Sequence, residues 1–151
     1  MTLGIFLAYL GVVFAFLFPG IGSALGLLMT GNATHGALEQ FPRRFGRFLP
    51  AAALPSSQGI YGFVIAFMLL RKLGTLSAID FYTGLYFLCS AIPVSVVGFF
   101  SALYQARVCV TGIELIKSDE TALGKVLTMG VFPELYAILG LMVSLFLVTA
   151  K

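Results

Sequence analysis

The sequence predicts an all-α membrane protein of four transmembrane helices, arranged as two tandem hairpins. Of its 151 residues, 60% are hydrophobic and only 10% are charged, whereas a soluble domain carries about 25% charged residues. Four apolar stretches each have the length needed to cross a hydrocarbon core of about 30 Å. Because a backbone in lipid must satisfy its own hydrogen bonds, these stretches are expected to be helices. They cover residues 3–29, 48–70, 81–106 and 126–148.

The first stretch, residues 3–29, is predicted to be a retained helix and not a signal peptide. A signal peptide needs a positively charged segment before its apolar region, and the first charged residue here is Glu39. Small residues recur at helical spacing in the first and third stretches, which lets helix backbones approach closely. These stripes fit packing within one chain and also a tight inner ring of many copies. They consist of Ala8, Gly11, Ala15, Gly22 and Gly26, and of Ala91, Ser95, Gly98 and Ala102.

The second stretch, residues 48–70, carries polar side chains near its middle. Four of its residues follow the spacing i, i+3, i+4, i+7, which places them along one side of a helix. The third stretch, residues 81–106, adds Gln105, with Ser101 one helical turn earlier on the same face. The four residues of the second stretch are Leu54, Ser57, Gln58 and Tyr61.

The fourth stretch, residues 126–148, contains one acid, Glu134, and no other charged residue. A carboxylate at that depth is costly unless a partner compensates it, so intramembrane acids are functional candidates by default. The polar residues of the second and third stretches are uncharged. We therefore expect side-chain oxygens from three helices to converge near Glu134.

Such a cluster has the chemistry of a site for a small hard cation, which prefers oxygen ligands. The amide oxygens of Gln58 and Gln105, the Ser57 hydroxyl and a backbone carbonyl would join the Glu134 carboxylate. Only Glu134 is charged, so a monovalent cation would neutralise the site, whereas Ca²⁺ or Mg²⁺ would leave excess positive charge. Tyr61 would donate its hydroxyl to Glu134 and hold the carboxylate in the binding rotamer.

Two prolines lie beside this polar layer, Pro55 and Pro133. A proline within a helix removes one backbone donor and permits a kink. The carbonyls released directly would be those of Ala51 and Met129. The sequence leaves open whether the kink also exposes the carbonyl of Leu54.

Basic residues predict the orientation, because Lys and Arg concentrate in short cytoplasmic loops. The connections within the two hairpins carry most of them, whereas the opposite side has only Arg71, Lys72 and Lys151. Both hairpin loops are therefore expected to face the cytoplasm, with both termini outside. The net charge of +3 arises at helix ends and does not indicate nucleic-acid binding. The basic residues of the hairpin connections are Arg43, Arg44, Arg47, Arg107, Lys117 and Lys125.

Five further polar residues are assigned structural places. His35 is expected in a solvated cytoplasmic loop. Arg107 is expected near the inner end of the third helix, extending to the lipid headgroups. Asp80 suits the N-terminus of the third helix, and Asp119 and Glu120 that of the fourth, because acids are favourable there.

The two halves of the chain match each other at a constant offset of 78 residues. The pattern Gly-x-x-Ser-Ala-Leu occurs at residues 20–25 and again at 98–103, and Pro55 aligns with Pro133. One offset that matches in both hairpins indicates an internal duplication. Parallel repeats of this kind pack around an axis along the membrane normal.

The predicted repeats are residues 1–76, the first transmembrane hairpin, and residues 77–151, the second. They differ at one chemically important position, because Glu134 aligns with Ser56. The second hairpin therefore carries the acid and the first lacks it.

Four segments resemble the rotor-ring proteolipid of V-type ATPases, in its bacterial four-helix form often called subunit K. They lie in all four predicted helices, so the resemblance covers nearly the whole chain. The segment in the second helix, Leu-Pro-Ser-Ser-Gln-Gly-Ile-Tyr-Gly, is the most specific of them. The four segments are residues 20–26, 54–67, 98–105 and 134–140.

The resemblance implies a role for each matching position. Glu134 would carry the ion, and Gln58 and Gln105 would supply side-chain oxygens to a bound Na⁺. Tyr61 would hold Glu134 in place. Ser57 stands where Thr is usual in sodium-type members, and it keeps the hydroxyl. The remaining ligand would be the backbone carbonyl of Leu54.

One feature departs from the family pattern. Pro133 directly precedes the glutamate, at a position where the family has no fixed proline. It would change the local helix and with it the fine geometry of the site.

The resemblance also implies the partners and the activity. Copies would form a ring in the cell membrane, beside a stator membrane subunit, central-stalk subunits and lipids. The chain would not be an enzyme by itself but would carry Na⁺, or alternatively H⁺, while ring rotation is coupled to ATP hydrolysis or synthesis. A competing interpretation is a small four-helix exporter of cationic drugs. Such a site usually has aromatic walls, and this chain has no Trp.

Overall fold

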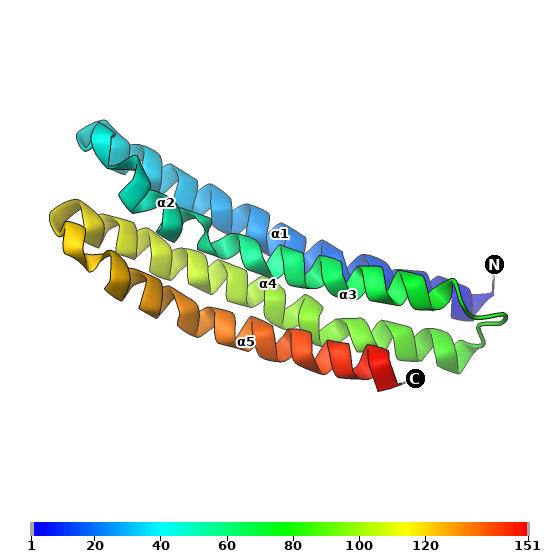
Figure 1. Ribbon diagram of the computed structural model, residues 1–151. Coiled ribbons are helices and arrows are strands. Elements are labelled where there is room, and N and C mark those ends of the chain that lie inside the picture. Colours follow the sequence, from blue (N-terminus) through cyan, green and yellow to red (C-terminus); the bar gives the residue numbers. More distant parts are fainter. Residues whose placement is uncertain (1, 151) are drawn as a thin grey trace.

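The computed structural model describes residues 2–150, which form a long bundle of helices (Figure 1). Within these residues there are no strands, and four spans are long and apolar enough to cross a membrane, as predicted. The first hairpin contains α1 (Leu3–Gln40), the 3₁₀ turn η1 (Pro42–Arg44), α2 (Phe45–Ala53), the 3₁₀ turn η2 (Leu54–Ser56) and α3 (Ser57–Leu73). The second contains α4 (Phe81–Ser118), the 3₁₀ turn η3 (Glu120–Ala122) and α5 (Leu123–Ala150).

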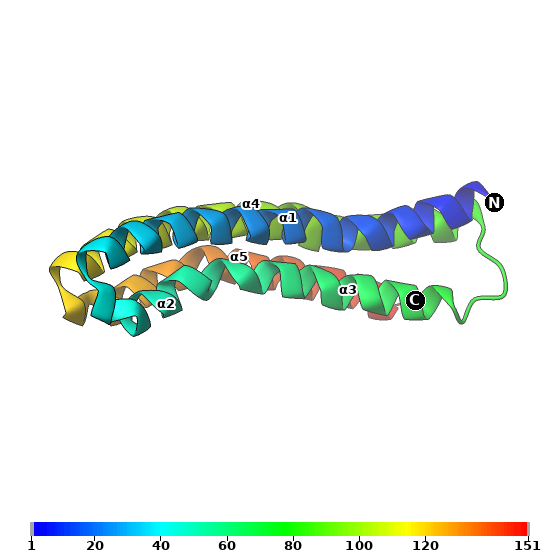
Figure 2. The same ribbon diagram turned by 90° about the horizontal axis from the view of Figure 1, so that it is seen from above.

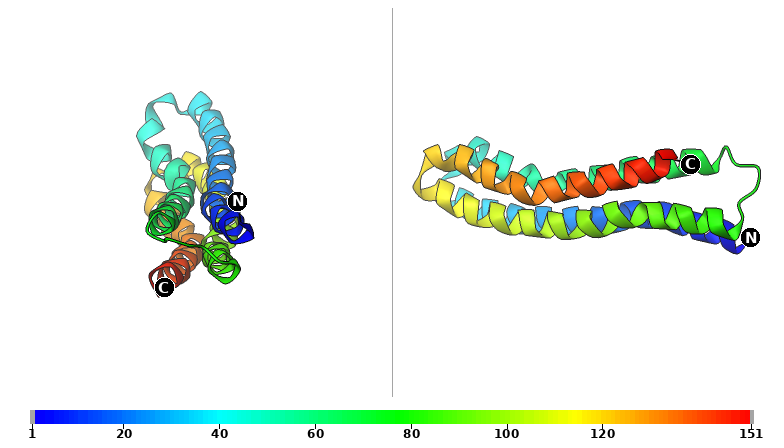
Figure 3. Two further views of the ribbon diagram at one scale, coloured as in Figure 1. Left: turned by 90° about the vertical axis from the view of Figure 1, so that its right-hand side faces the viewer. Right: turned by 90° about the horizontal axis from the view of Figure 1, so that it is seen from below.

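The four membrane spans form two layers. Helices α1 and α4 run side by side along one layer, and α2, α3 and α5 occupy the other (Figure 2). The two hairpin tips lie at one end of the bundle, while both termini and the connection between the hairpins lie at the other (Figure 3). Most of the basic residues that were expected to share one side of the membrane lie at or beside these tips, and Arg107 does not.

Helices α1 and α4 are longer than their apolar stretches. Each has 38 residues, which at 1.5 Å per residue gives about 57 Å. The expected loop position of His35 is therefore wrong, because His35 lies exposed within α1. Arg107 likewise lies well inside α4 and not near its end. Hydropathy detects the part of a helix that suits lipid, and these helices continue beyond it.

A second apolar core holds the helical extensions together near the tips. It is separate from the core among α1, α3, α4 and α5 in the rest of the bundle. Phe48 of α2 is its largest side chain and has no exposed surface. The buried members are Ala37, Phe48, Ala51, Ile113, Ile116 and Val126.

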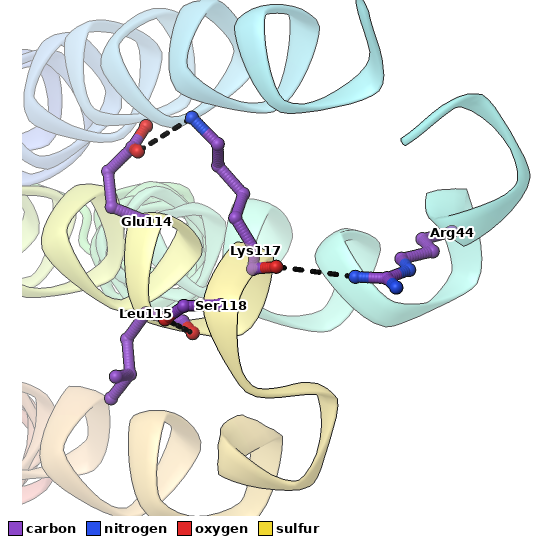
Figure 4. A network of polar contacts seen from close by, with 5 residues as sticks. All are labelled: Arg44, Glu114, Leu115, Lys117 and Ser118. Carbon is purple, nitrogen blue, oxygen red and sulfur yellow. Dashed lines mark hydrogen bonds and ion pairs between the residues drawn. The ribbon is translucent and has the colours of Figure 1, made fainter. Parts of the chain in front are cut away.

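Arg44 joins the two tips. Its guanidinium forms a 2.7 Å salt bridge with Glu120. Figure 4 shows its second contact, in which it donates to the carbonyl of Lys117 at 3.3 Å. The same group lies 4.3 Å from the ring centre of Phe41. Each hairpin is thus anchored to the other at its end, in addition to the apolar contacts.

Helix ends are capped as the sequence predicts. The Asp80 carboxylate accepts from the Thr83 backbone N–H at 2.9 Å and begins α4. Asp119 accepts from the hydroxyl and the backbone N–H of Thr121 and begins η3, with Glu120 in its first turn. The pKa of Asp119 lies below its ordinary value, mainly because the Thr121 hydroxyl donates to its carboxylate and secondly because the Thr121 backbone N–H does so too.

The C-terminus of α5 is also capped by side chains. Lys72 donates to the Val148 carbonyl and Tyr86 to the Leu147 carbonyl, each at 2.6 Å. The last carbonyls of a helix have no intrahelical partner, so both contacts satisfy groups that would otherwise lie unpaired near the membrane.

The α1–α4 contact depends on glycine at the closest points. A Cβ added at Gly22 would lie 2.8 Å from the Phe99 carbonyl oxygen, and one at Gly11 would lie 2.8 Å from that of Phe87. Real Cβ atoms do not approach backbone oxygens this closely, so any larger residue would push the helices apart.

Substituting Gly22→Ala is expected to destabilise the protein by about 1–3 kcal/mol, the usual cost of overpacking. The control Gly31→Ala lies on the same helix, where an added Cβ meets no atom within 4 Å. It is expected to stabilise by up to about 1 kcal/mol, because alanine favours helix over glycine. Unfolding in mixed micelles of rising SDS content, followed by circular dichroism, measures both. Equal effects of the two variants would show that α1 and α4 do not depend on this contact.

Candidate functional site

Pro55 interrupts the helix of the second membrane span. Helix α2 ends at Ala53 and α3 begins at Ser57, with the 3₁₀ turn η2 between them. Proline cannot donate the helical hydrogen bond, and its ring clashes with the preceding turn. The carbonyls near this break receive side-chain donors instead: Thr30 donates to Ala52 and Ser56 to Ala53, both at 2.7 Å.

Leu54 and Ser57 face each other at this break. The Leu54 carbonyl accepts from the Ser57 backbone N–H and, at 3.4 Å, from the Ser57 hydroxyl. These contacts keep both groups at the N-terminus of α3. Among the described residues neither group is hydrogen-bonded to Glu134, so this predicted pair is not part of the hydrogen-bond network around the acid.

Pro133 acts differently from Pro55. Helix α5 is continuous through it, and the ribbon bends near the middle of α5 without breaking (Figure 2). The Pro133 carbonyl accepts from the Ser101 hydroxyl at 2.7 Å. This hydrogen bond joins α5 to α4 at the proline.

Glu134 lies half-buried where α3, α4 and α5 meet. Tyr61 of α3 donates its hydroxyl to Oε1 at 2.7 Å, and Gln105 of α4 donates from Nε2 to Oε2 at 3.2 Å. Each carboxylate oxygen therefore has one donor from a different helix. Spacing along the sequence predicted this meeting of three helices, and the structure brings these side chains together.

Two glutamines extend the network into the core. Gln58 and Gln105 have no exposed surface, and Nε2 of Gln58 donates to Oε1 of Gln105 at 2.8 Å. Gln58 also donates to the Ser101 hydroxyl at 3.3 Å, and Gln105 to the Gly130 carbonyl at 2.9 Å. The amides thus connect α3, α4 and α5 in one layer.

One buried acceptor in this layer has no donor. Oε1 of Gln58 is buried without a hydrogen bond, and it is the only buried side-chain N or O atom without a partner among residues 2–150. Leaving such a group unsatisfied costs about 1–3 kcal/mol. An unsatisfied amide oxygen, a second amide oxygen and one carboxylate form a layer rich in acceptors, which is the chemistry that accommodates a small cation.

The structure adds contributors that the predicted ligand set lacked. The Gly130 carbonyl lies one turn before Glu134 and accepts from Gln105. The sequence could not indicate this contact, because every residue has a backbone carbonyl. Ser101 was visible as the residue one turn before Gln105, but its link to Pro133 was not. Ser23 of α1 accepts from the Gly59 backbone N–H at 2.9 Å, so it supports the first turn of α3.

Fold and site together define a small membrane protein that places one networked carboxylate within a duplicated helical hairpin. The family model of the ATP synthase C-subunit matches residues 10–69 and again residues 88–147. Both limits of the second match lie 78 residues after those of the first, which is the offset of the internal duplication. The chain belongs to the ATP synthase C-subunit family.

Two curated relatives agree with this assignment. The chain is 38% identical to V-type sodium ATPase subunit K of Enterococcus hirae over 145 residues, 96% of this chain and 92% of that protein. It is 30% identical to A-type ATP synthase subunit K of Methanocaldococcus jannaschii over 128 residues, 85% of this chain and 55% of that protein. The chain is thus a rotor-ring proteolipid of a rotary ATPase, which translocates ions and does not itself catalyse ATP chemistry.

The Ser101 hydroxyl is predicted to hold α4, α5 and Gln58 together. Ser101→Ala removes two hydrogen bonds, one of them to the buried Gln58 amide and the other to the half-buried Pro133 carbonyl, so we expect a loss of about 1–3 kcal/mol in unfolding free energy. Ser118→Ala is the matched control, because within residues 2–150 the exposed Ser118 hydroxyl bonds only to Leu115 of its own helix (Figure 4). The control is expected to change stability by less than about 0.5 kcal/mol. Unfolding in SDS-containing micelles compares them, and an equally small effect of Ser101→Ala would contradict the network.

Proposed function

We propose that this rotor-ring protein transports Na⁺ across the membrane on Glu134, with H⁺ as the alternative cargo. The observation that carries the proposal is the unsatisfied Oε1 of Gln58, buried in the same layer as the one acid. A bound cation would satisfy this oxygen, because hard cations take oxygen ligands. The name of the Enterococcus relative, a sodium ATPase subunit, supports the choice of Na⁺.

The proposed ligands are all oxygens, as a hard cation requires. Glu134 supplies the charge that neutralises a monovalent ion, and Tyr61 holds its carboxylate. Among residues 2–150 no three His, Cys, Asp or Glu residues gather as they would around a multivalent metal. The proposed ligands are Glu134, Gln58, Gln105, Ser57 and the Leu54 carbonyl.

Ion binding would rearrange the hydrogen bonds of the site. The Ser57 hydroxyl, now bonded to Leu54, would turn towards the ion, and the Leu54 carbonyl would be shared with it. The 3₁₀ turn at Pro55 makes this change small, because the Leu54 carbonyl already lies at an interruption of the helix. At the other side of the site, the bend at Pro133 would set the angle at which Glu134 enters it.

The proposed transport cycle follows from electrostatics. A site whose carboxylate is neutralised by its ion crosses the lipid face of the ring at low cost, whereas an empty carboxylate there is expensive. Beside a stator membrane subunit the ion would leave to one side and be replaced from the other. Each charge moved is worth about 2.3 kcal/mol per 100 mV, so several ions must be summed for each ATP, and central-stalk subunits would connect the ring to that chemistry.

We further propose that the hairpin tips face the cytoplasm and the termini face outside. Arg43 and Arg47 are exposed at the tips, and basic residues mark the cytoplasmic side. At the opposite end Lys72 is engaged in capping α5, which accounts for a basic residue that the orientation rule alone leaves unexplained. The family assignment replaces the alternative of a small drug exporter.

Carbodiimide labelling of Glu134 tests the ion assignment. In purified rings near neutral pH we expect Na⁺, but not K⁺, to slow labelling. The Gln58→Leu variant should need a higher Na⁺ concentration for the same protection, because it lacks one proposed ligand. Glu134→Gln is the blank that identifies the labelled residue. Labelling that responds to pH and is indifferent to Na⁺ would assign H⁺ as the cargo.

Tyr61→Phe tests the hydrogen bond that holds the carboxylate. Hydrogen bonds to charged groups contribute about 1.5–3 kcal/mol, which corresponds to a weakening of Na⁺ protection by about 10- to 150-fold. Tyr82→Phe serves as control, because Tyr82 is 77% exposed and lies at the far end of the bundle. Unchanged protection in Tyr61→Phe would show that this contact does not contribute to binding.

A further inference from the structure

Tyr136 presents a polar group in a part of the chain that faces lipid or another protein. It lies in α5 two residues after Glu134 and is 68% exposed. Within residues 2–150 its hydroxyl forms no hydrogen bond. A hydroxyl in an apolar environment costs about 1–3 kcal/mol when it lacks a partner, so a partner from outside the chain is favoured at this depth.

A groove between α1 and α3 lies open on the surface of the first hairpin. It has a volume of about 430 Å³, and two of its lining residues, Ser23 and Ser56, carry hydroxyls. Gly20 and Gly59 line it without side chains, which leaves room for a ring. The rest of its lining is mostly apolar.

The duplication identifies what fills the equivalent groove in the second hairpin. At the offset of 78 residues, Ser23 corresponds to Ser101 and Ser56 to Glu134. The space beside Ser101 is filled from the first hairpin by Gln58, which is fully buried and donates to the Ser101 hydroxyl at 3.3 Å. The residue that corresponds to Gln58 is Tyr136.

We propose that Tyr136 of each copy inserts into the groove between α1 and α3 of the neighbouring copy, with its hydroxyl beside Ser23 and Ser56. The contact between copies then repeats the contact between the two hairpins of one chain. This inference rests on the ring assembly described above. In this arrangement the Tyr136 ring fills the groove, and the Tyr136 hydroxyl gains hydrogen-bond partners in Ser23 and Ser56.

The same correspondence gives this contact a different chemistry from the ion site. Ser56 stands in place of the carboxylate, and Leu27 stands in place of Gln105. The groove therefore offers no charge to a cation. A tyrosine ring fills the space that amides and an ion occupy in the other half.

Photocrosslinking tests this contact in assembled rings. Tyr136 is replaced by benzoylphenylalanine, which keeps an aromatic ring and reacts with nearby C–H bonds, and the products are mapped by mass spectrometry. We expect links between copies to residues 16–27 or 56–63. Leu135 carries the same reagent in the control, because it is 47% exposed but points about 100° away around the helix. The control is expected to give no link to either segment.

The outcomes separate this inference from the proposed function. Native mass spectrometry verifies the ring, and Na⁺ protection of Glu134 is measured on the same sample. Links from position 136 to other segments, or none in a verified ring, would overturn the inference while Na⁺ protection upholds the ion assignment. If a verified ring gives the expected links but Na⁺ does not protect Glu134, the ion assignment is overturned and the inference about Tyr136 is upheld.

Tyr136→Phe is a second variant. It should still form rings but dissociate in SDS at a lower temperature than the parent. An unchanged dissociation temperature would show that the Tyr136 hydroxyl does not contribute to the contact between copies.

Discussion

The structure depends on satisfying one carboxylate away from water. Tyr61 and Gln105 each donate to one oxygen of Glu134, and both donors need partners or fixed positions of their own. Gln105 is held by Gly130 and Gln58, and Gln58 by Ser101. Because each link crosses from one helix to another, the bundle must keep three helices in register. The hydrogen bonds around Glu134 therefore hold α3, α4 and α5 in register, and they can form only when these three helices are packed in that register.

Close packing of α1 against α4 makes this register possible and also distinguishes the two halves. Gly22 and Gly26 of α1 let α4 approach to backbone contact. At the offset of the duplication they correspond to Phe100 and Tyr104, which are about half exposed on α4.

The sequence predicted the parts of this structure that depend on residue type and missed those that depend on backbone geometry. Spacing alone placed Tyr61, Gln58 and Gln105 around Glu134, because helical periodicity and the cost of a buried charge both constrain them. It did not predict the 3₁₀ turn that pairs Leu54 with Ser57, since Pro133 has the same residue type as Pro55 and leaves its helix continuous. The ends of α1 and α4 were missed because their polar extensions bury side chains against Phe48 and not against lipid.

Those extensions have a mechanical consequence. At about 57 Å, α1 and α4 outreach a hydrocarbon core of about 30 Å, and they continue past it without a flexible joint. Their outer parts share an apolar core, and Arg44 fastens one tip to the other. A force applied at the tips would thus be transmitted along continuous helices to the level of Glu134, with little lost in bending or twisting of loops.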